Sequence, residues 1–234
     1  MSAAQRLRTS LLIPLQFVAV LWVIQIFQWL SIYELGYLGI YPRSVSGLRG
    51  IFMSPLLHSG FDHLLSNTPP LIVLWAMVLF FYPRISTPVF LLIYLLTGLG
   101  VWVFARPVYH IGASGVIYGL VAFVFWSGLF RRNVRSIALA LIVALYYGSM
   151  FMGILPIKPG VSWESHLIGG IAGILVAFWF KNSMEKEEIR EAYSWETQPE
   201  ESNFFLERDT FEQTRREKEV KRRDDFPNWF STRT

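Results

Sequence analysis

The sequence predicts an all-helical membrane protein, in which a bundle of six spanning helices is followed by a charged segment in water. Composition is the first observation that predicts this fold class, since 53% of the 234 residues are hydrophobic and only 16% are charged. Arrangement is the second, because the hydrophobic residues come in long blocks. Such a chain has more apolar surface than one soluble core can bury, so it is expected to lie in a lipid bilayer.

Six apolar blocks are each expected to cross the membrane as a helix, since roughly 20 residues span about 30 Å of hydrocarbon. In chain order they cover residues 11–31, 61–82, 87–104, 113–130, 134–152 and 165–180. The first is too long for the apolar core of a typical signal peptide and is expected to be retained. The connection at residues 32–60 is long and apolar, so we expect a first loop that is partly membrane-embedded or packed on the bundle.

Charge divides the chain at about residue 180. Ten of the 21 Lys and Arg residues, but only three of the 17 acidic residues, come before residue 181. We therefore expect a membrane domain at residues 1–180 and a charged, partly disordered tail in water at residues 181–234. Within that tail, residues 184–192 and 211–223 have the composition of charged helices.

The basic residues also predict an orientation, because Lys and Arg are enriched in the cytoplasmic connections of membrane proteins. Both termini are expected in the cytoplasm, with the protein in the cell membrane. On the inner side this places Arg6, Arg8, Arg84, Arg131, Arg132, Arg135 and Lys181. On the outer side it leaves Arg43, Arg49, Arg106 and Lys158.

Polar residues inside apolar spans are costly in lipid and are therefore candidates for function. Ser114, Asn67 and His166 each precede a basic residue at the inner end of their own span by 15 to 17 positions. At the rise of an α-helix, all three stand about 22–26 Å from the inner face. His63 lies one turn from Asn67 on the same helix face. A hydroxyl, an imidazole and an amide at one depth are the groups that nucleophilic acyl transfer requires, although each alone is better explained as a hydrogen bond between helices.

Glycines predict how the fourth and sixth spans pack. Gly115 and Gly119 share one face of the fourth span, and Gly169 and Gly173 share the face of the sixth that carries His166. Glycine on facing helices permits close backbone contact, so His166 is expected to reach the Ser114 hydroxyl. Tyr118, one turn below Ser114, is placed to support the imidazole ring.

Three segments together carry a resemblance to a known family. They are HSGFDHLLSN at residues 58–67, GASGVIYG at residues 112–119 and HLIGGIAG at residues 166–173. In these segments and their order, the chain resembles the rhomboid-family intramembrane serine proteases of the basic six-helix form, over about residues 11–180. The resemblance implies a rhomboid-like helical bundle and a serine endopeptidase that uses a Ser/His dyad.

The resemblance assigns a role to each candidate residue. It implies that Ser114 is the nucleophile and that His166 is its general base and acid. His63, Asn67 and the Ser114 backbone amide would form the oxyanion hole, and Tyr118 would pack on His166. Supporting positions around these residues are Gly112, Gly115, Gly169 and Gly173.

The resemblance further implies that the substrates are transmembrane segments of other membrane proteins, which enter sideways. The fifth span and the loop at residues 153–163 are expected to control that entry. Water is expected to reach the site through a polar opening lined by His58, Ser59, Asp62 and His63.

Two further expectations concern residues near these motifs. No third acid is expected in the site, because Glu164 lies two residues from His166 and therefore points to another helix face. The family frequently has a Trp-Arg pair in the first loop, where this chain has Leu48 and Arg49. That departure concerns the anchoring of the loop more than the chemistry.

Alternative functions are a catalytically inactive rhomboid-like protein that binds transmembrane clients, a transporter or channel, and a metal site. Inactive forms usually lack the serine or the histidine, whereas this chain has both. Transporters more often place charged residues or broken helices at mid-depth. A metal site on His58, His63 and His166 would have no carboxylate at ligand spacing, and no cysteine is present to supply a thiolate or a nucleophile. No cofactor is expected, and the sequence has no stripe of basic residues for nucleic acid.

Overall fold

The computed structural model describes residues 3–31, 34–157, 160–183 and 212–225. The chain divides into two compact units, Met1–Ile189 and Arg190–Thr234. In the second unit, helix α9 covers Arg215–Asp225, which overlaps the predicted charged helix at residues 211–223 and ends two residues beyond it. The other predicted tail helix, at residues 184–192, and most of the expected disordered tail lie outside the described residues. The predicted boundary after residue 180 stays a prediction.

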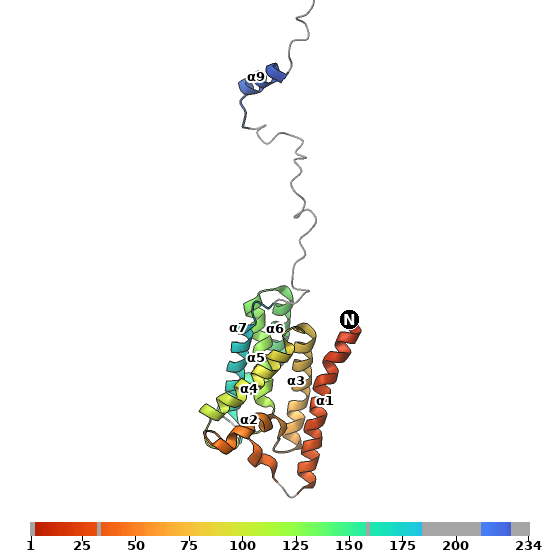
Figure 1. Cartoon of the computed structure of the whole chain (residues 1–234), viewed down its shortest axis with the longest axis vertical. Helices are drawn as coiled ribbons and strands as arrows, with labels where there is room; N and C mark the ends of the chain where they lie inside the picture. The colour runs from red at the N-terminus through yellow and green to blue at the C-terminus, as the bar shows by residue number, and fades with distance from the viewer. Residues whose placement is uncertain (1–2, 32–33, 158–159, 184–211, 226–234) are drawn as a thin grey trace, which may run out of the picture. The chain divides into compact units, whose positions relative to one another are not determined.

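The first unit is a helical bundle, as the apolar blocks predict (Figure 1). Its long helices are α1 (Ala3–Leu30), α3 (Phe61–Phe81), α4 (Ser86–Phe104), α5 (Ser114–Arg131), α6 (Val134–Tyr147) and α7 (Trp163–Trp179). Five stretches are long and apolar enough to cross a membrane, counting α6 together with the 3-10 helix η4 (Gly148–Ile154) that continues it. The sixth predicted span is α7, which has 17 residues and so stands at the short end of the spanning range.

The first loop is built from short helical turns and packs on the bundle. Its elements are η1 (Leu35–Leu38), η2 (Val45–Arg49), α2 (Gly50–Met53) and η3 (Ser54–Leu56). The Arg43 guanidinium donates to the carbonyls of Val103 and Ala105 at the end of α4, at 3.1 and 2.8 Å. Because these carbonyls have no partner within the helix, the loop both anchors itself and completes the hydrogen bonding of α4.

Helix α5 lies in the middle of the bundle and contacts α3, α4, α6 and α7. It is the most buried of the five long apolar stretches, with half of its apolar window inside the protein. Its core side chains Leu120, Phe123 and Val124 are fully covered by the surrounding helices. Helix α1 lies at one edge of the bundle beside α3 (Figure 1). Because α5 is central, residues in its first turn can face the helices that surround it.

Glycines allow α5 and α7 to approach until their backbones touch. A Cβ atom built on Gly169 would overlap the carbonyl oxygen of Gly115, and one built on Gly173 would overlap the carbonyl oxygen of Gly119. A Cβ on Gly115 would stand 3.0 Å from the carbonyl oxygen of Ser165. Any larger residue must therefore push the two helices apart, which fixes the spacing between the residues that they carry.

The α5–α7 contact predicts different effects of alanine at two adjacent glycines. Gly169→Ala should lower the free energy of unfolding by about 1–3 kcal/mol, since the added methyl group is forced against backbone. Gly170→Ala is the matched control, because a Cβ at Gly170 meets nothing within 4 Å. Thermal unfolding of both variants in detergent measures the difference. Equal stability of the two would contradict the close backbone contact.

Candidate active site

Ser114 is the first residue of α5, and a glycine turn places it there. Gly112 has a φ of +113°, a conformation that residues with a Cβ rarely adopt. A Cβ on Gly112 would also stand 2.8 Å from Cε1 of His63. The Gly112 amide donates to the Ser54 carbonyl at 2.8 Å, which ties this turn to the first loop. Glycine is therefore needed both for the backbone and for the approach of the His63 ring.

The structure brings the Ser114 hydroxyl to the ring of His166, in the first turn of α7. The Ser114 Oγ lies 2.8 Å from His166 Nε2, and His166 Nδ1 lies 2.8 Å from the carbonyl oxygen of Gly153. A carbonyl only accepts, so these partners assign the proton of the neutral ring to Nδ1. Nε2 is then free to accept from the serine hydroxyl. A base needs this tautomer to remove the serine proton.

Tyr118 and Gly153 hold the imidazole in place. The rings of Tyr118 and His166 are stacked, with centroids 4.2 Å apart and planes 5° from parallel. Tyr118 Oη donates to the carbonyl of Met150 at 2.7 Å, so the tyrosine is itself fixed by η4. A Cβ on Gly153 would overlap the Tyr118 hydroxyl. Sequence reasoning placed Tyr118 here but missed the Gly153 carbonyl, since a backbone acceptor has no signature in the sequence.

His63 and Asn67 of α3 line the same cavity as Ser114 and His166, which has a volume of about 930 Å³. The side chain of Asn67 is almost entirely buried, at 6% exposed, and its Nδ2 has no hydrogen-bond partner within the described part of the chain. His63 Nδ1 lies 3.1 Å from the Ser59 hydroxyl. If that hydroxyl donates, the proton of His63 is on Nε2. The part of the cavity lined by α3 therefore carries the Asn67 amide donor and the His63 ring.

The polar opening is only partly as expected. Ser59, Asp62 and His63 line the cavity, but His58 does not. His58 is buried, at 1% exposed, and its Nε2 accepts from the Ala113 amide at 3.4 Å. The prediction that His58 lines the opening is therefore wrong. His58 instead lies behind the turn before Ser114, where burial and then the nearby His63 lower its pKa to about 4.

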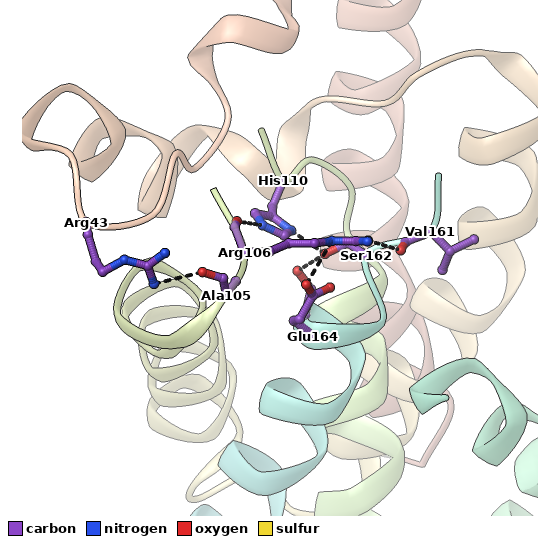
Figure 2. A network of polar contacts seen from close by, with 8 residues as sticks. Arg43, Ala105, Arg106, His110, Val161, Ser162 and Glu164 are labelled. Atoms are coloured by element: carbon purple, nitrogen blue, oxygen red, sulfur yellow. Dashed lines mark hydrogen bonds and ion pairs between the residues drawn. The ribbon is translucent and has the colours of Figure 1, made fainter. Parts of the chain in front are cut away.

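Glu164 does not contact the His166 ring in the structure. Its carboxylate is buried and pairs with the Arg106 guanidinium, Nε to Oε1, at 2.9 Å (Figure 2). The same guanidinium donates to the carbonyl of Val161. Beside this pair, the ring of His110 lies 2.6 Å from the hydroxyl of Ser162. Sequence reasoning did not anticipate this network, because its members come from two connections whose folds have no periodic pattern.

No cluster of three or more His, Cys, Asp or Glu side chains suited to a metal ion occurs among the residues that the structure describes. The ring centroids of His58 and His63 are 5.0 Å apart, with the planes nearly perpendicular. Since His58 turns away from the cavity and toward the Ala113 amide, the arrangement gives no support to the metal alternative.

The protein is thus a helical membrane protein with a serine–histidine pair in contact inside its bundle. The Rhomboid domain matches residues 46–183, more than half of the chain, and the chain belongs to the rhomboid family. Uncharacterized proteins of Mycobacterium tuberculosis and Mycobacterium bovis are each 38% identical over 174 residues, which cover 70% of this chain and 72% of theirs. An uncharacterized protein of Mycobacterium leprae is 32% identical over 173 residues, 70% of this chain and 68% of its own.

The burial of His58 predicts a pH dependence of stability. Its pKa is lower in the folded protein than in the unfolded chain, so the unfolded chain binds more protons between about pH 4 and 6.5. The free energy of unfolding should therefore fall as the pH drops from 6.5 toward 4. His58→Gln keeps an acceptor for the Ala113 amide but does not titrate, so its stability should fall less. Denaturant unfolding at pH 7 and pH 5 tests this, and identical pH dependence in both proteins would contradict it.

Proposed function

We propose that this protein is an intramembrane serine endopeptidase that cleaves transmembrane segments with the dyad Ser114 and His166. The observation that carries the proposal is the 2.8 Å contact between Ser114 Oγ and His166 Nε2, with the ring fixed from behind by the Gly153 carbonyl. Membership of the rhomboid family supports the same activity. The presence of both residues, in contact, favours the protease over an inactive form that only binds transmembrane clients.

Acyl transfer follows from this geometry. His166 Nε2 takes the proton of the Ser114 hydroxyl while Oγ attacks the carbonyl carbon of the scissile peptide bond. The imidazolium then gives that proton to the leaving amine, the peptide C–N bond breaks, and the acyl group stays on Ser114 as an ester. A water molecule, deprotonated by His166, attacks the ester and releases the new carboxyl end with regeneration of the hydroxyl.

The oxyanion of each tetrahedral intermediate requires donors, and α3 supplies them in this proposal. Asn67 Nδ2 is a buried donor at the cavity, with no partner among the residues that the structure describes. The second donor is Nε2–H of His63, and the third is the amide of Ser114, which stands at the start of α5 where amides have no helical acceptor. Fixed donors in a water-poor site stabilise developing charge strongly, because they need no reorganisation during the reaction.

A dyad without an acid is consistent with the surroundings of His166. The Gly153 carbonyl orients the ring and favours the Nδ1–H tautomer, while Tyr118 covers one ring face. The Glu164 carboxylate is occupied by Arg106. The imidazolium is therefore contacted by a carbonyl dipole and by the stacked tyrosine, while the Glu164 carboxylate is bound to Arg106 and does not touch the ring.

Transmembrane segments are the proposed substrates, and they enter from the side of the bundle. The cavity is lined by residues of α3, α5, α7 and η4, so a segment beside α6 and η4 would reach Ser114. The α6–η4 stretch is the least buried of the long apolar stretches, at 17%, and so is the least constrained by packing. We also propose cytoplasmic termini, which puts the Ser114 end of α5 toward the outer face.

Cleavage of a single-span model substrate by the purified protein tests the proposed function. Ser114→Ala and His166→Ala should each reduce cleavage about a thousandfold or more, since the two residues act as a unit. Ser127→Ala, which removes a buried hydroxyl further along α5, should cleave at nearly the rate of the wild type. A fluorophosphonate probe should label the wild type but not the Ser114→Ala variant. Cleavage that survives in either dyad variant would exclude the mechanism.

The proposed oxyanion donors predict a milder defect at α3. Asn67→Ala should lower kcat about 10- to 100-fold with little change in KM, because its amide acts on charge that exists only in the transition state. Residual activity is expected, since His63 and the Ser114 amide remain. Steady-state cleavage kinetics measure both parameters. An unchanged kcat would remove Asn67 from the site, and a rise in KM alone would make it a substrate-binding residue.

A further inference from the structure

A polar network beside the dyad, whose members Val161 and Ser162 also line the cavity, joins two positions that stand in the same relation to the dyad. His110 comes four residues before Ser114, and Ser162 comes four residues before His166. The Nδ1 atom of His110 lies 2.6 Å from the Ser162 hydroxyl oxygen (Figure 2). One hydrogen bond therefore connects the segment that leads into α5 with the residue that precedes α7.

The direction of this hydrogen bond is fixed by the neighbours of the ring. His110 Nε2 lies 3.0 Å from the carbonyl oxygen of Arg106, which can only accept, so the ring proton is on Nε2. Nδ1 is then an acceptor, and Ser162 donates to it. Burial lowers the pKa of His110, with the charge of Arg106 acting in the same direction, while the Arg106 carbonyl and the charge of Glu164 oppose it. The ring is thus kept neutral, as an acceptor needs to be.

Burial and hydrogen bonds of its backbone fix the position of His110, in addition to the hydrogen bond of its ring to Ser162. His110 is 1% exposed, and its backbone exchanges two hydrogen bonds with Ile40, at 2.9 and 3.0 Å. The Ser54 hydroxyl donates to its carbonyl at 2.8 Å. On the other side, the Ser162 hydroxyl lies 2.6 Å from that of Ser165, the residue before His166. The link therefore runs from a rigid segment to the first turn of α7.

A second link joins the same two segments. The Arg106 guanidinium pairs with Glu164 at 2.9 Å and donates to the Val161 carbonyl at 2.9 Å. The Glu164 side chain is almost fully buried, whereas that of Arg106 is about half exposed, so water reaches the pair from the Arg106 side. Two polar links thus hold the start of α7 against the chain that precedes α5.

We propose that His110 and Ser162 are positioning residues, whose hydrogen bond sets the register of α7 along α5 and so the distance from Ser114 to His166. The glycine contacts bring the two helices together but are not directional, so they do not alone prevent sliding along the axis. A hydrogen bond one turn before each dyad residue supplies that direction. The inference rests on the proposed function, since its purpose is to align the dyad.

Kinetics of four variants test the role. Ser162→Ala and His110→Gln should each lower kcat about tenfold with KM nearly unchanged, because a small misalignment of reacting groups slows the chemical step. The Gln amide can still donate toward the Arg106 carbonyl. The double variant should be no worse than either single one, since both remove the same interaction. Ser162→Thr, which keeps the hydroxyl, should restore most of the rate.

The control is Ser86→Ala, which removes another buried hydroxyl, one that donates to the Pro83 carbonyl before α4. It should cleave at nearly the rate of the wild type. A wild-type kcat in Ser162→Ala, a hundredfold loss in the double variant, or no rescue by threonine would each overturn the proposed role.

Hydrogen exchange tests the same role without turnover. The amides of Ser165 and His166 donate to the Ser162 carbonyl at 3.1 and 3.4 Å. These amides should exchange about threefold faster or more in Ser162→Ala and His110→Gln, but not in Ser86→Ala. Unchanged exchange would overturn the inference whether or not the protein cleaves. A wild type that exchanges as expected but neither cleaves nor reacts with a fluorophosphonate would instead refute the proposed function.

Discussion

The structure depends on one contact, in which glycines of α7 lie directly against carbonyl oxygens of α5. Lipid offers no hydrophobic force to press two apolar helices together, so their attraction comes from close packing over matched surfaces. Gly169 against Gly115 and Gly173 against Gly119 give that match. The same contact carries Ser114 and His166 in the first turns of α5 and α7, where the helices are close enough for a direct hydrogen bond. The contact that packs α5 against α7 therefore also positions the two residues of the candidate site.

Several buried polar side chains of the bundle have hydrogen-bond partners, whereas a few others, Asn67 among them, have none within the described residues. His166, Tyr118 and His110 each find partners in backbone carbonyls of the connections. The Asn67 amide nitrogen has no partner in the described part of the chain, and a buried donor left unpaired costs about 1–3 kcal/mol. An unpaired donor that faces a cavity is explained if the cavity binds a group that accepts from it. The proposed oxyanion is such a group.

Much of this arrangement could be predicted from the sequence, and the features that could not be predicted share identifiable physical reasons. The apolar blocks predict the helices. The number of residues from Ser114, His166 and Asn67 to the basic end of each span places all three at one depth. The glycine rows predict that α5 and α7 approach closely. The burial of His58 was missed, because spacing within a loop does not determine which way a side chain turns. The Gly153 carbonyl and the Arg106–Glu164 pair were missed because they depend on how irregular connections fold, for which the sequence has no periodic signal.

The most direct test of the central claim is an experimental structure of the protein after reaction with a phosphonate inhibitor. We expect a covalent bond from phosphorus to Ser114 Oγ, with α5 and α7 still in contact at Gly115 and Gly169. We also expect that the phosphonyl oxygen accepts from Asn67 Nδ2 on α3, while His166 stays beside Oγ. Phosphorus on a different residue, or a phosphonyl oxygen directed away from α3, would contradict the central claim.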